Sequence, residues 1–234
     1  MRGFIDYAGR HIDYRASHSA RTTLAISVHP DGSVEVVAPE GTSQRDIELR
    51  LHKRANWVLH QQRYFDQFRP RTPERKFVSG ETHLYLGRQY RLKIEAGAED
   101  RVRLVGGDFR ASSKEDSSAS RVAENLAGWY RRHADVKLAR GFRHLTDRYS
   151  RHLLCEPTLS IRPMKRRWGS FSSNGRITLN VDLIRAPLPC IDYVIVHELA
   201  HSREPNHGRA FFELLGQLMP DWEIRKRTLE RFLS

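Results

Sequence analysis

The chain has 234 residues, of which 39% are hydrophobic, and its mean hydropathy is -0.63. This length suits one large domain or two small ones, and it suffices to bury a hydrophobic core. No apolar run approaches the roughly 18 residues that a membrane span needs, and Asp6 comes too early for a signal-peptide core to form. The two cysteines, Cys155 and Cys190, cannot build a disulfide framework. These features exclude a secreted, membrane or disulfide-stapled protein, and we expect a cytoplasmic one.

Positive charge is concentrated in one part of the sequence. Lys and Arg number 40 against 28 Asp and Glu, which gives a net charge of +12. Residues 121–170 hold 12 basic and 4 acidic side chains, so 8 of the 12 net charges lie there. Such clustering is typical of a surface that faces nucleic acid, and also of a solvated helix in an arginine-rich chain. The segment matches no nucleic-acid-binding motif, which favours the solvated helix but leaves both interpretations open.

The first hundred residues are predicted to be rich in β-strands, with one helix among them. Ser43 and Asp46 resemble a capping box, and apolar residues follow at helical spacing to about Phe68. Pro70 and Pro73 are expected to end this helix. The predicted strands are 22–29, 33–38, 84–86, 89–94 and 101–105, with turns at 30–32, 87–88 and 97–98.

A serine-rich segment separates the two halves of the sequence. Residues 108–120 hold five serines and little apolar content, which predicts a linker or a mobile loop. We therefore expect a β-rich region over residues 1–107 and a more helical domain over residues 121–234. No internal repeat is evident in the sequence.

The second half is predicted to be mainly helical. From Arg121 to Tyr149 the apolar residues step mostly by three or four, which indicates one or two amphipathic helices with a possible break at Gly141. Pro187 and Pro189 are expected to begin a later helix. The other predicted elements are strands at 158–162, 168–172 and 177–180 and helices at 191–201, at 208–219 and from Pro220 onward.

The motif that carries chemistry is His197-Glu198-Leu199-Ala200-His201, an HExxH sequence on a predicted helix. Four residues span about 400° of helix, so both imidazoles project from nearly the same face. This spacing lets two ring nitrogens bind one zinc ion. Glu198 can then reach a water at the metal and, as the general base, take its proton while the water attacks a carbonyl.

A third histidine follows at a useful distance. His207 comes six residues after His201, and Pro205-Asn206 breaks the helix so that the chain can turn His207 back to the metal. Three protein ligands and a water make the open arrangement of catalytic zinc sites. A random sequence of this composition would hold HExxH with a histidine at one stated offset only about 2 times in 1000. Glu204 and Glu213 are alternative third ligands that the spacing favours less than His207.

The same spacing occurs in metzincins, but Glu204 stands where that group has glycine, so the chain is not expected to be a metzincin. The chain instead resembles the YgjP-like family of zinc metallopeptidases, which is related to the SprT-like and WLM peptidases. The residues that carry the resemblance are Arg167-Trp168-Gly169-Ser170, Gly175 to Asn180, Ile191 to His201, Asn206-His207-Gly208, Phe211-Phe212 and Met219-Pro220-Asp221.

The resemblance implies a zincin-like catalytic half over residues 121–234 and one zinc ion held by His197, His201 and His207. It implies Glu198 as the catalytic carboxylate, and a strand near Trp168 beside the active site. The family often has Cys after Trp-Gly-Ser, where this chain has Phe171, so no thiol can act at that position.

The leading hypothesis is therefore a zinc-dependent peptidase whose substrate is a peptide or a protein. The alternative is a nucleic-acid-associated protein that uses the basic segment 121–170, and the SprT-like relatives suggest a peptidase acting on DNA-bound proteins. A metal-dependent amidase or deformylase is the weakest alternative, because no cysteine ligand is available. Neither Tyr193 nor Arg209 can be chosen from the sequence as the group that stabilises the oxyanion.

Overall fold

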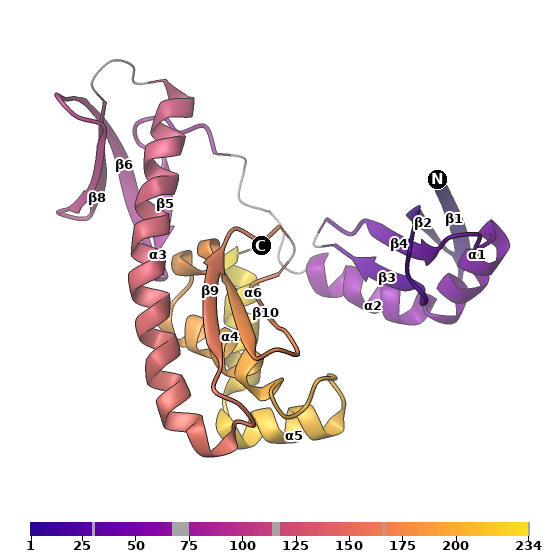
Figure 1. Ribbon diagram of the computed structural model, residues 1–234. Helices are drawn as coiled ribbons and strands as arrows, with labels where there is room; N and C mark the ends of the chain where they lie inside the picture. Colours follow the sequence, from indigo (N-terminus) through magenta and orange to yellow (C-terminus); the bar gives the residue numbers. More distant parts are fainter. Residues whose placement is uncertain (30, 67–74, 114–117, 166, 234) are drawn as a thin grey trace. The chain divides into compact units, whose positions relative to one another are not determined.

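The computed structural model describes residues 1–29, 31–66, 75–113, 118–165 and 167–233. The chain divides into two compact units, Met1–Thr72 and Pro73–Leu233, and each has a hydrophobic core of its own (Figure 1). Both units combine strands and helices, so the expected α+β class is confirmed. The expected features outside the described residues are Pro30 of the first turn, the helix end at Phe68, the prolines at 70 and 73, residues 114–117 of the serine-rich segment, and Arg166.

The first unit is a four-stranded sheet with two helices. The sheet has the order β1-β2-β4-β3, in which β1 and β3 pair antiparallel with their neighbours and β2 lies parallel to β4. The strands are β1 Arg2–Tyr7, β2 Arg10–Ser19, β3 Ala25–Val28 and β4 Val34–Pro39. The last two strands form the hairpin that the sequence predicts, while the first two were not predicted.

Two helices follow where the sequence predicts one. These are α1 Gln44–Lys53 and α2 Ala55–Asp66. The predicted cap is present, because the Ser43 hydroxyl accepts a hydrogen bond from the Asp46 backbone N–H. The helix is interrupted at Arg54, whose backbone leaves the helical region (φ -105°, ψ 4°). Ile47 and Leu51 of α1 and Val58 of α2 are buried in the core of this unit.

The second unit begins with another four-stranded sheet, of order β5-β6-β8-β7. Its strands are β5 Thr82–Tyr85, β6 Arg88–Ala96, β7 Arg101–Val105 and β8 Asp108–Ser113. Three of these strands match the predicted meander. The fourth, β8, occupies the start of the segment that was expected to be a linker.

The domain boundary therefore differs from the expected one. The chain divides near Thr72 and Pro73, not at residues 108–120. Alternate residues of β8 are buried, namely Phe109, Ala111 and Ser113, so the strand completes a sheet of the second unit. Because the segment is rich in serine, it was not evident from the sequence that every second residue of this strand faces the core.

The two sheets repeat the same topology and register, although the sequence showed no repeat. Tyr14 pairs with Val34 in the first sheet as Leu92 pairs with Phe109 in the second. Each sheet also begins with a hairpin turn of sequence Tyr-x-Gly-Arg, at residues 7–10 and 85–88. Both central residues of each turn have positive φ, between 48° and 79°, as a type I′ turn requires.

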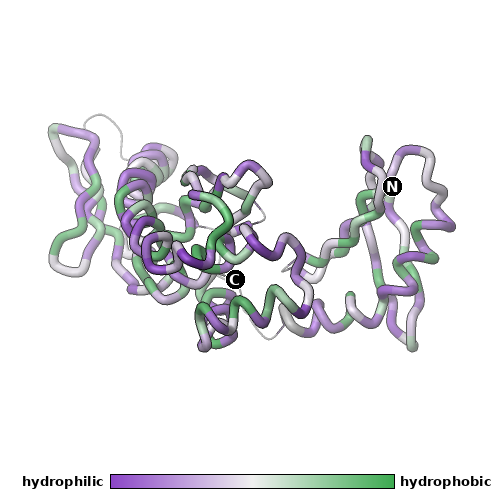
Figure 2. Tube along the Cα trace, turned by 60° about the horizontal axis from the view of Figure 1, so that its bottom comes forward, coloured by the Kyte–Doolittle hydropathy of each residue, from purple (hydrophilic) through white to green (hydrophobic). Residues whose placement is uncertain are grey.

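Helix α3, Ala119–Tyr149, is a single helix of 31 residues that passes unbroken through Gly141. It packs on β7 and β8 of the second sheet, and further along on the third sheet and on α4 (Figure 1). A Cβ atom at Gly141 would lie 3.4 Å from Ile195 Cδ1, so the glycine allows close packing against α4. Hydrophilic and hydrophobic segments alternate along the tube in Figure 2, as expected of elements with one buried face.

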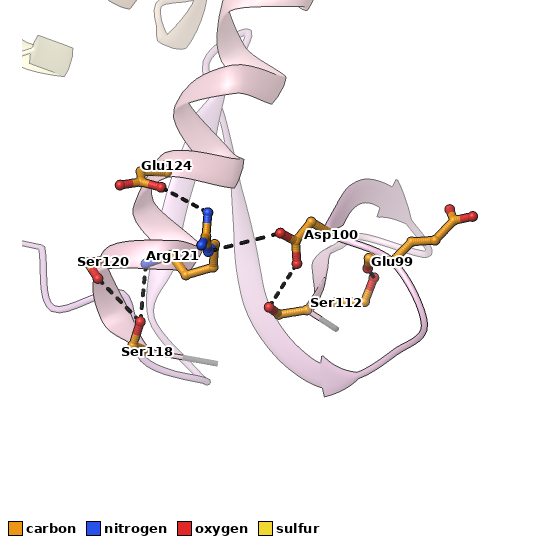
Figure 3. A network of polar contacts seen from close by, with 8 residues as sticks. Glu99, Asp100, Ser112, Ser118, Ser120, Arg121 and Glu124 are labelled. Atoms are coloured by element: carbon orange, nitrogen blue, oxygen red, sulfur yellow. Dashed lines mark hydrogen bonds and ion pairs between the residues drawn. The ribbon is translucent and has the colours of Figure 1, made fainter. Parts of the chain in front are cut away.

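The start of α3 is tied to the second sheet by polar contacts. The Asp100 carboxylate lies between β6 and β7, where it accepts a hydrogen bond from the Ser113 hydroxyl and pairs with Arg121 at 4.0 Å (Figure 3). Arg121 also pairs with Glu124 at 3.4 Å. Ser118 caps the helix by accepting a hydrogen bond from the Arg121 backbone N–H. Of these contacts, the exposed Asp100–Arg121 pair joins α3 to the sheet, and the others lie within the helix or within the sheet.

The rest of the unit surrounds α4 (Leu188–Ala200), the helix that carries the HExxH motif. A third sheet, of order β10-β11-β9, lies beside it. The other elements are η1 Ser150–His152, β9 Thr158–Arg162, β10 Gly169–Phe171, β11 Arg176–Asn180, η2 Val181–Arg185, α5 Arg209–Leu218 and α6 Trp222–Leu233. In the part of the chain that the structure describes, no helix combines the length and apolar character of a membrane span.

The second sheet fixes the point where the chain enters α4. The turn between β5 and β6 donates two backbone hydrogen bonds, from Leu86 to the Ile184 carbonyl and from Gly87 to the Arg185 carbonyl, both 3.0 Å long. A Cβ atom at Gly87 would lie 2.7 Å from Pro187 Cγ, so only glycine fits this contact.

His83 of β5 is expected to make the stability of the second unit dependent on pH. Its side chain is buried between the rings of Phe77 and Phe109, and its Nε2 lies 3.3 Å from Glu81 Oε2 without hydrogen-bond geometry. Burial and the nearby Arg75 lower the His83 pKa to about 4, against a weaker opposing effect of Glu81. Because the folded pKa lies below the unfolded value, the stabilisation is complete above pH 6.5 and is lost as the pH falls towards 4.

We expect His83→Leu to remove this dependence. Between pH 7.5 and pH 5, the free energy of unfolding of the wild type should fall by about 1–2 kcal/mol relative to the variant. Urea unfolding at a series of pH values measures the free energy of unfolding of both proteins. The effects of other titrating groups cancel when the values for the variant are subtracted from those for the wild type. Parallel pH profiles of the two proteins would contradict the prediction.

Candidate metal centre

The buried helix α4 positions the first two histidines of the site. Pro187 is its N-cap and Pro189 lies in its first turn. The backbone N–H groups of a first turn have no partner within the helix, so the N–H that proline lacks costs no helical hydrogen bond. Apolar side chains cover nearly its whole circumference, namely Ile191, Val194, Ile195, Val196 and Leu199. His197 and His201 therefore emerge from a helix that is surrounded by protein, and both are only partly exposed.

The structure brings His197, His201 and His207 together. One ring nitrogen of each lies within 4.8 Å of those of the other two, and the Nε2 atoms of His197 and His207 are 2.9 Å apart. His201 Nδ1 lies 2.9 Å from the backbone carbonyl of Glu204. Because a carbonyl can only accept, Nδ1 carries the proton and Nε2 keeps a free lone pair that points to the centre.

The loop after α4 carries His207 to the other two histidines. The helix ends at Ala200, and backbone hydrogen bonds from Arg203 and Glu204 to the Ala200 carbonyl wrap the chain around its C-terminus. This end agrees to within one residue with the predicted end at His201, where the turn begins. His207 is exposed, whereas the other two imidazoles lie deeper.

The electrostatic environment favours the neutral form of His197 and of His207. Burial lowers the pKa of His197 to about 3, with smaller contributions from the neighbouring histidines and from Lys226 of α6. Burial, His201 and Lys226 also lower the pKa of His207. Neutral imidazoles are the form that binds a metal. Three such nitrogens with an exposed side fit a zinc ion that keeps one position for water.

Phe211 forms the apolar support of this cluster. Its side chain is fully buried, and its ring centroid lies 4.9, 4.6 and 4.7 Å from those of His197, His201 and His207. The next residue, Phe212, is partly exposed and stacks on Trp222 at 5.3 Å. Sequence reasoning assigned Phe211 no such role, and helical spacing carries no signal for it, because His207 lies in the loop before α5.

Glu198 is buried beside the histidine cluster, with 6% of its surface exposed. Burial raises its pKa to about 7, while the charge of Arg167 and a hydrogen bond from the Phe171 backbone N–H oppose the shift. Its carboxylate lies against Gly169 of β10, so the strand near Trp168 does lie beside this centre. A carboxylate poised near neutral pH suits general acid–base chemistry.

Other candidates from the sequence lie elsewhere or have other partners. Glu204 contributes its backbone carbonyl, and the Glu213 carboxylate pairs with Arg209 at 2.6 Å, so neither carboxylate joins the three histidines. The Arg209 side chain is 92% exposed. Tyr193 is buried, with its ring 5.8 Å from that of His197, and burial and the Glu198 charge raise its pKa.

Other serine, cysteine and histidine residues have structural or surface positions. Ser172 donates hydrogen bonds to Asn174 and to the Arg176 carbonyl, which hold the turn between β10 and β11. Burial raises the pKa of the Cys190 thiol to about 11, so it is unreactive. The exposed residues are Cys155, His52, His60 and His144.

Comparisons with known proteins identify a metallopeptidase family. The family model described as "YgjP-like, metallopeptidase domain" matches residues 22–232. Among solved structures, the chain is similar to the metallopeptidase zymogen jannalysin of Methanocaldococcus jannaschii, with 22% identity over 39% of this chain and 94% of that one (TM-score 0.33). It is also similar to the zymogen abylysin of Pyrococcus abyssi, with 23% identity over 39% and 87% (TM-score 0.34). A search among curated proteins found no match.

Replacing Phe211 should weaken metal binding without removing a ligand. Phe211→Leu keeps the core filled but removes the ring that supports all three imidazoles, so we expect the dissociation constant for zinc to rise about 10-fold. Competition with a chromophoric chelator measures it. Leu218→Ala, near the far end of the same helix, serves as the control that lowers stability and leaves zinc affinity unchanged. An unaltered affinity in Phe211→Leu would show that the ring does not support the ligands.

Proposed function

The chain belongs to the YgjP-like family of metallopeptidases, and we propose that it hydrolyses peptide bonds at one zinc ion held by His197, His201 and His207. The observation that carries this proposal is the cluster of three imidazole nitrogens within 4.8 Å of one another, with the buried Glu198 directly after His197 on the same helix. This combination of donors and carboxylate is that of a zincin-like active site with an open position for substrate.

In this proposal each residue has a defined task. Zinc in such a site acidifies water and polarises the carbonyl of the scissile peptide bond. Glu198 accepts a proton from the attacking water and passes it to the amide nitrogen as the carbon–nitrogen bond breaks. The Glu204 carbonyl holds His201 in the tautomer that presents Nε2. Phe211 closes the inner side of the cluster, which excludes water from behind the imidazoles.

Glu198→Gln tests the mechanism. The amide keeps the size of the side chain but cannot accept the proton, so we expect kcat to fall about 100-fold or more. The zinc content should stay at one per chain, as elemental analysis can measure after purification without chelators. His207→Ala is the matched control, and it should lose zinc as well as activity. Turnover of a denatured, labelled protein at the wild-type rate by Glu198→Gln would refute the assigned role.

A second candidate function, binding of nucleic acid, is favoured by one observation. Five cations of α3 are exposed and have no carboxylate within ion-pair distance among the described residues, namely Arg132, Lys137, Arg140, Arg143 and Arg148. Other cations of this helix are neutralised, since Arg121 and Arg131 pair with Glu124 and Asp135. A peptidase with such a surface could act on proteins bound to DNA.

The salt dependence of DNA binding tests this second function. If α3 contacts phosphates, the logarithm of the association constant should fall linearly with that of the salt concentration. The triple variant Lys137→Ala, Arg140→Ala and Arg143→Ala should lower the affinity at least about 10-fold and flatten the slope.

The matched control removes the same charge from exposed positions of the second sheet, by Arg88→Ala, Arg91→Ala and Arg103→Ala. It should bind DNA nearly as the wild type does. Equal losses in the two triple variants, or no binding by the wild type, would exclude α3 as a nucleic-acid surface.

A further inference from the structure

The strand β10 lies at the edge of the third sheet, and its free side faces α4. Among the residues that the structure describes, it pairs with β11 alone, through a register that matches Ser170 with Thr178. The Trp168 carbonyl and the Ser172 N–H bond to β11. Because alternate residues of an antiparallel strand face the same neighbour, the backbone groups of Gly169 and Phe171 point away from β11.

On this free side, Gly169 is in direct contact with Glu198. A Cβ atom at Gly169 would lie 2.7 Å from Glu198 Oε1, 2.8 Å from Cγ and 3.0 Å from Cδ. Contacts below 3.0 Å require something to move, and here the atoms belong to a buried side chain with little room. The carboxylate therefore occupies the space that any other residue at position 169 would fill.

The same strand also supplies a polar contact. The backbone N–H of Phe171, two residues further on, donates a hydrogen bond to the Glu198 carboxylate, and the Arg167 charge lies near it. A main-chain donor on a sheet strand is fixed in place, so it sets the direction of the carboxylate more firmly than a mobile side chain could.

The strand is itself held rigidly. The buried Asn180 of β11 donates hydrogen bonds to the carbonyls of Met164 and Arg167, at 2.8 and 3.0 Å. Its side-chain oxygen accepts from the Met164 N–H at 3.3 Å. These bonds anchor the segment that leads into β10, so Gly169 and Phe171 keep their positions relative to α4.

We propose that Gly169 and the backbone N–H of Phe171 are positioning groups that hold the Glu198 carboxylate at the metal centre. The missing side chain of Gly169 leaves room for the Glu198 carboxylate, and the Phe171 N–H orients that carboxylate. Together they restrict Glu198 to one orientation. The catalytic consequence rests on the function proposed above, but the contact itself does not. The two are therefore tested separately, first in metal-free protein and then by activity.

The first experiment measures thermal stability in protein stripped of metal with a chelator. With Glu198 present, Gly169→Ala should lower the melting temperature by about 5 °C or more, because the methyl group and the carboxylate compete for one space. With Glu198→Ala, the same change at position 169 should leave the melting temperature unchanged or raise it, since the space is empty.

The control for this pair of comparisons is Gly128→Ala in α3, whose added methyl group would meet only the end of Arg132 at 3.4 Å. Its effect should be the same in both backgrounds. Equal shifts for Gly169→Ala with and without Glu198 would overturn the proposed contact, whether or not the protein is a peptidase.

The second experiment measures catalysis. Gly169→Ala should lower kcat about 10-fold or more, with KM and one zinc per chain retained, because a misplaced base slows the reaction without weakening substrate binding. Glu198→Asp shortens the side chain and leaves room for the methyl group, so adding Gly169→Ala to it should cause little further loss. An equal loss in both backgrounds would mean that Gly169 does not act through Glu198.

Discussion

The structure depends on the burial of α4, a helix that is apolar on almost every side and still carries ionisable groups. Removing imidazoles and a carboxylate from water is costly unless each finds a partner. The partners come from three directions: the Glu204 carbonyl for His201, the β10 backbone for Glu198, and the imidazoles for one another. The sheets and α3 hold α4 in place, so the metal centre is a consequence of where this helix is packed.

The sequence predicted the cluster of three histidines more completely than it predicted the fold around it. Positions 197, 198 and 201 follow from the helical period alone, and the proline after them accounts for the return of His207. Gly169 and Phe211 could not be assigned in this way, because their roles arise from tertiary contacts that no local period encodes. The serine-rich composition of 108–120 masked β8, and the two strands before residue 20 were missed because polar residues alternate with their core side chains.

The same four-stranded sheet occurs in both units, but its first hairpin turn makes different contacts in each. In the second unit, the turn at residues 86–87 bonds to the main chain that enters α4. In the first unit, the corresponding turn at residues 8–9 has the same backbone conformation, yet a Cβ atom at Gly9 would meet no atom within 4 Å. The shared Tyr-x-Gly-Arg sequence therefore encodes the turn itself. The contact with the chain that enters α4 is an additional feature of the turn in the second unit.

The order of these modules along the chain has a kinetic consequence. Each four-stranded sheet consists of two hairpins joined by one parallel pairing, so most of its pairings are local in sequence and close quickly during folding. Synthesis proceeds from the N-terminus, and domains generally fold as units in that order. The residues of the metal centre, on α4 and the loop after it, are made after both sheets and α3. The first unit can thus fold before α4 leaves the ribosome, whereas the second sheet and α3 complete their folding together with α4, as parts of one unit.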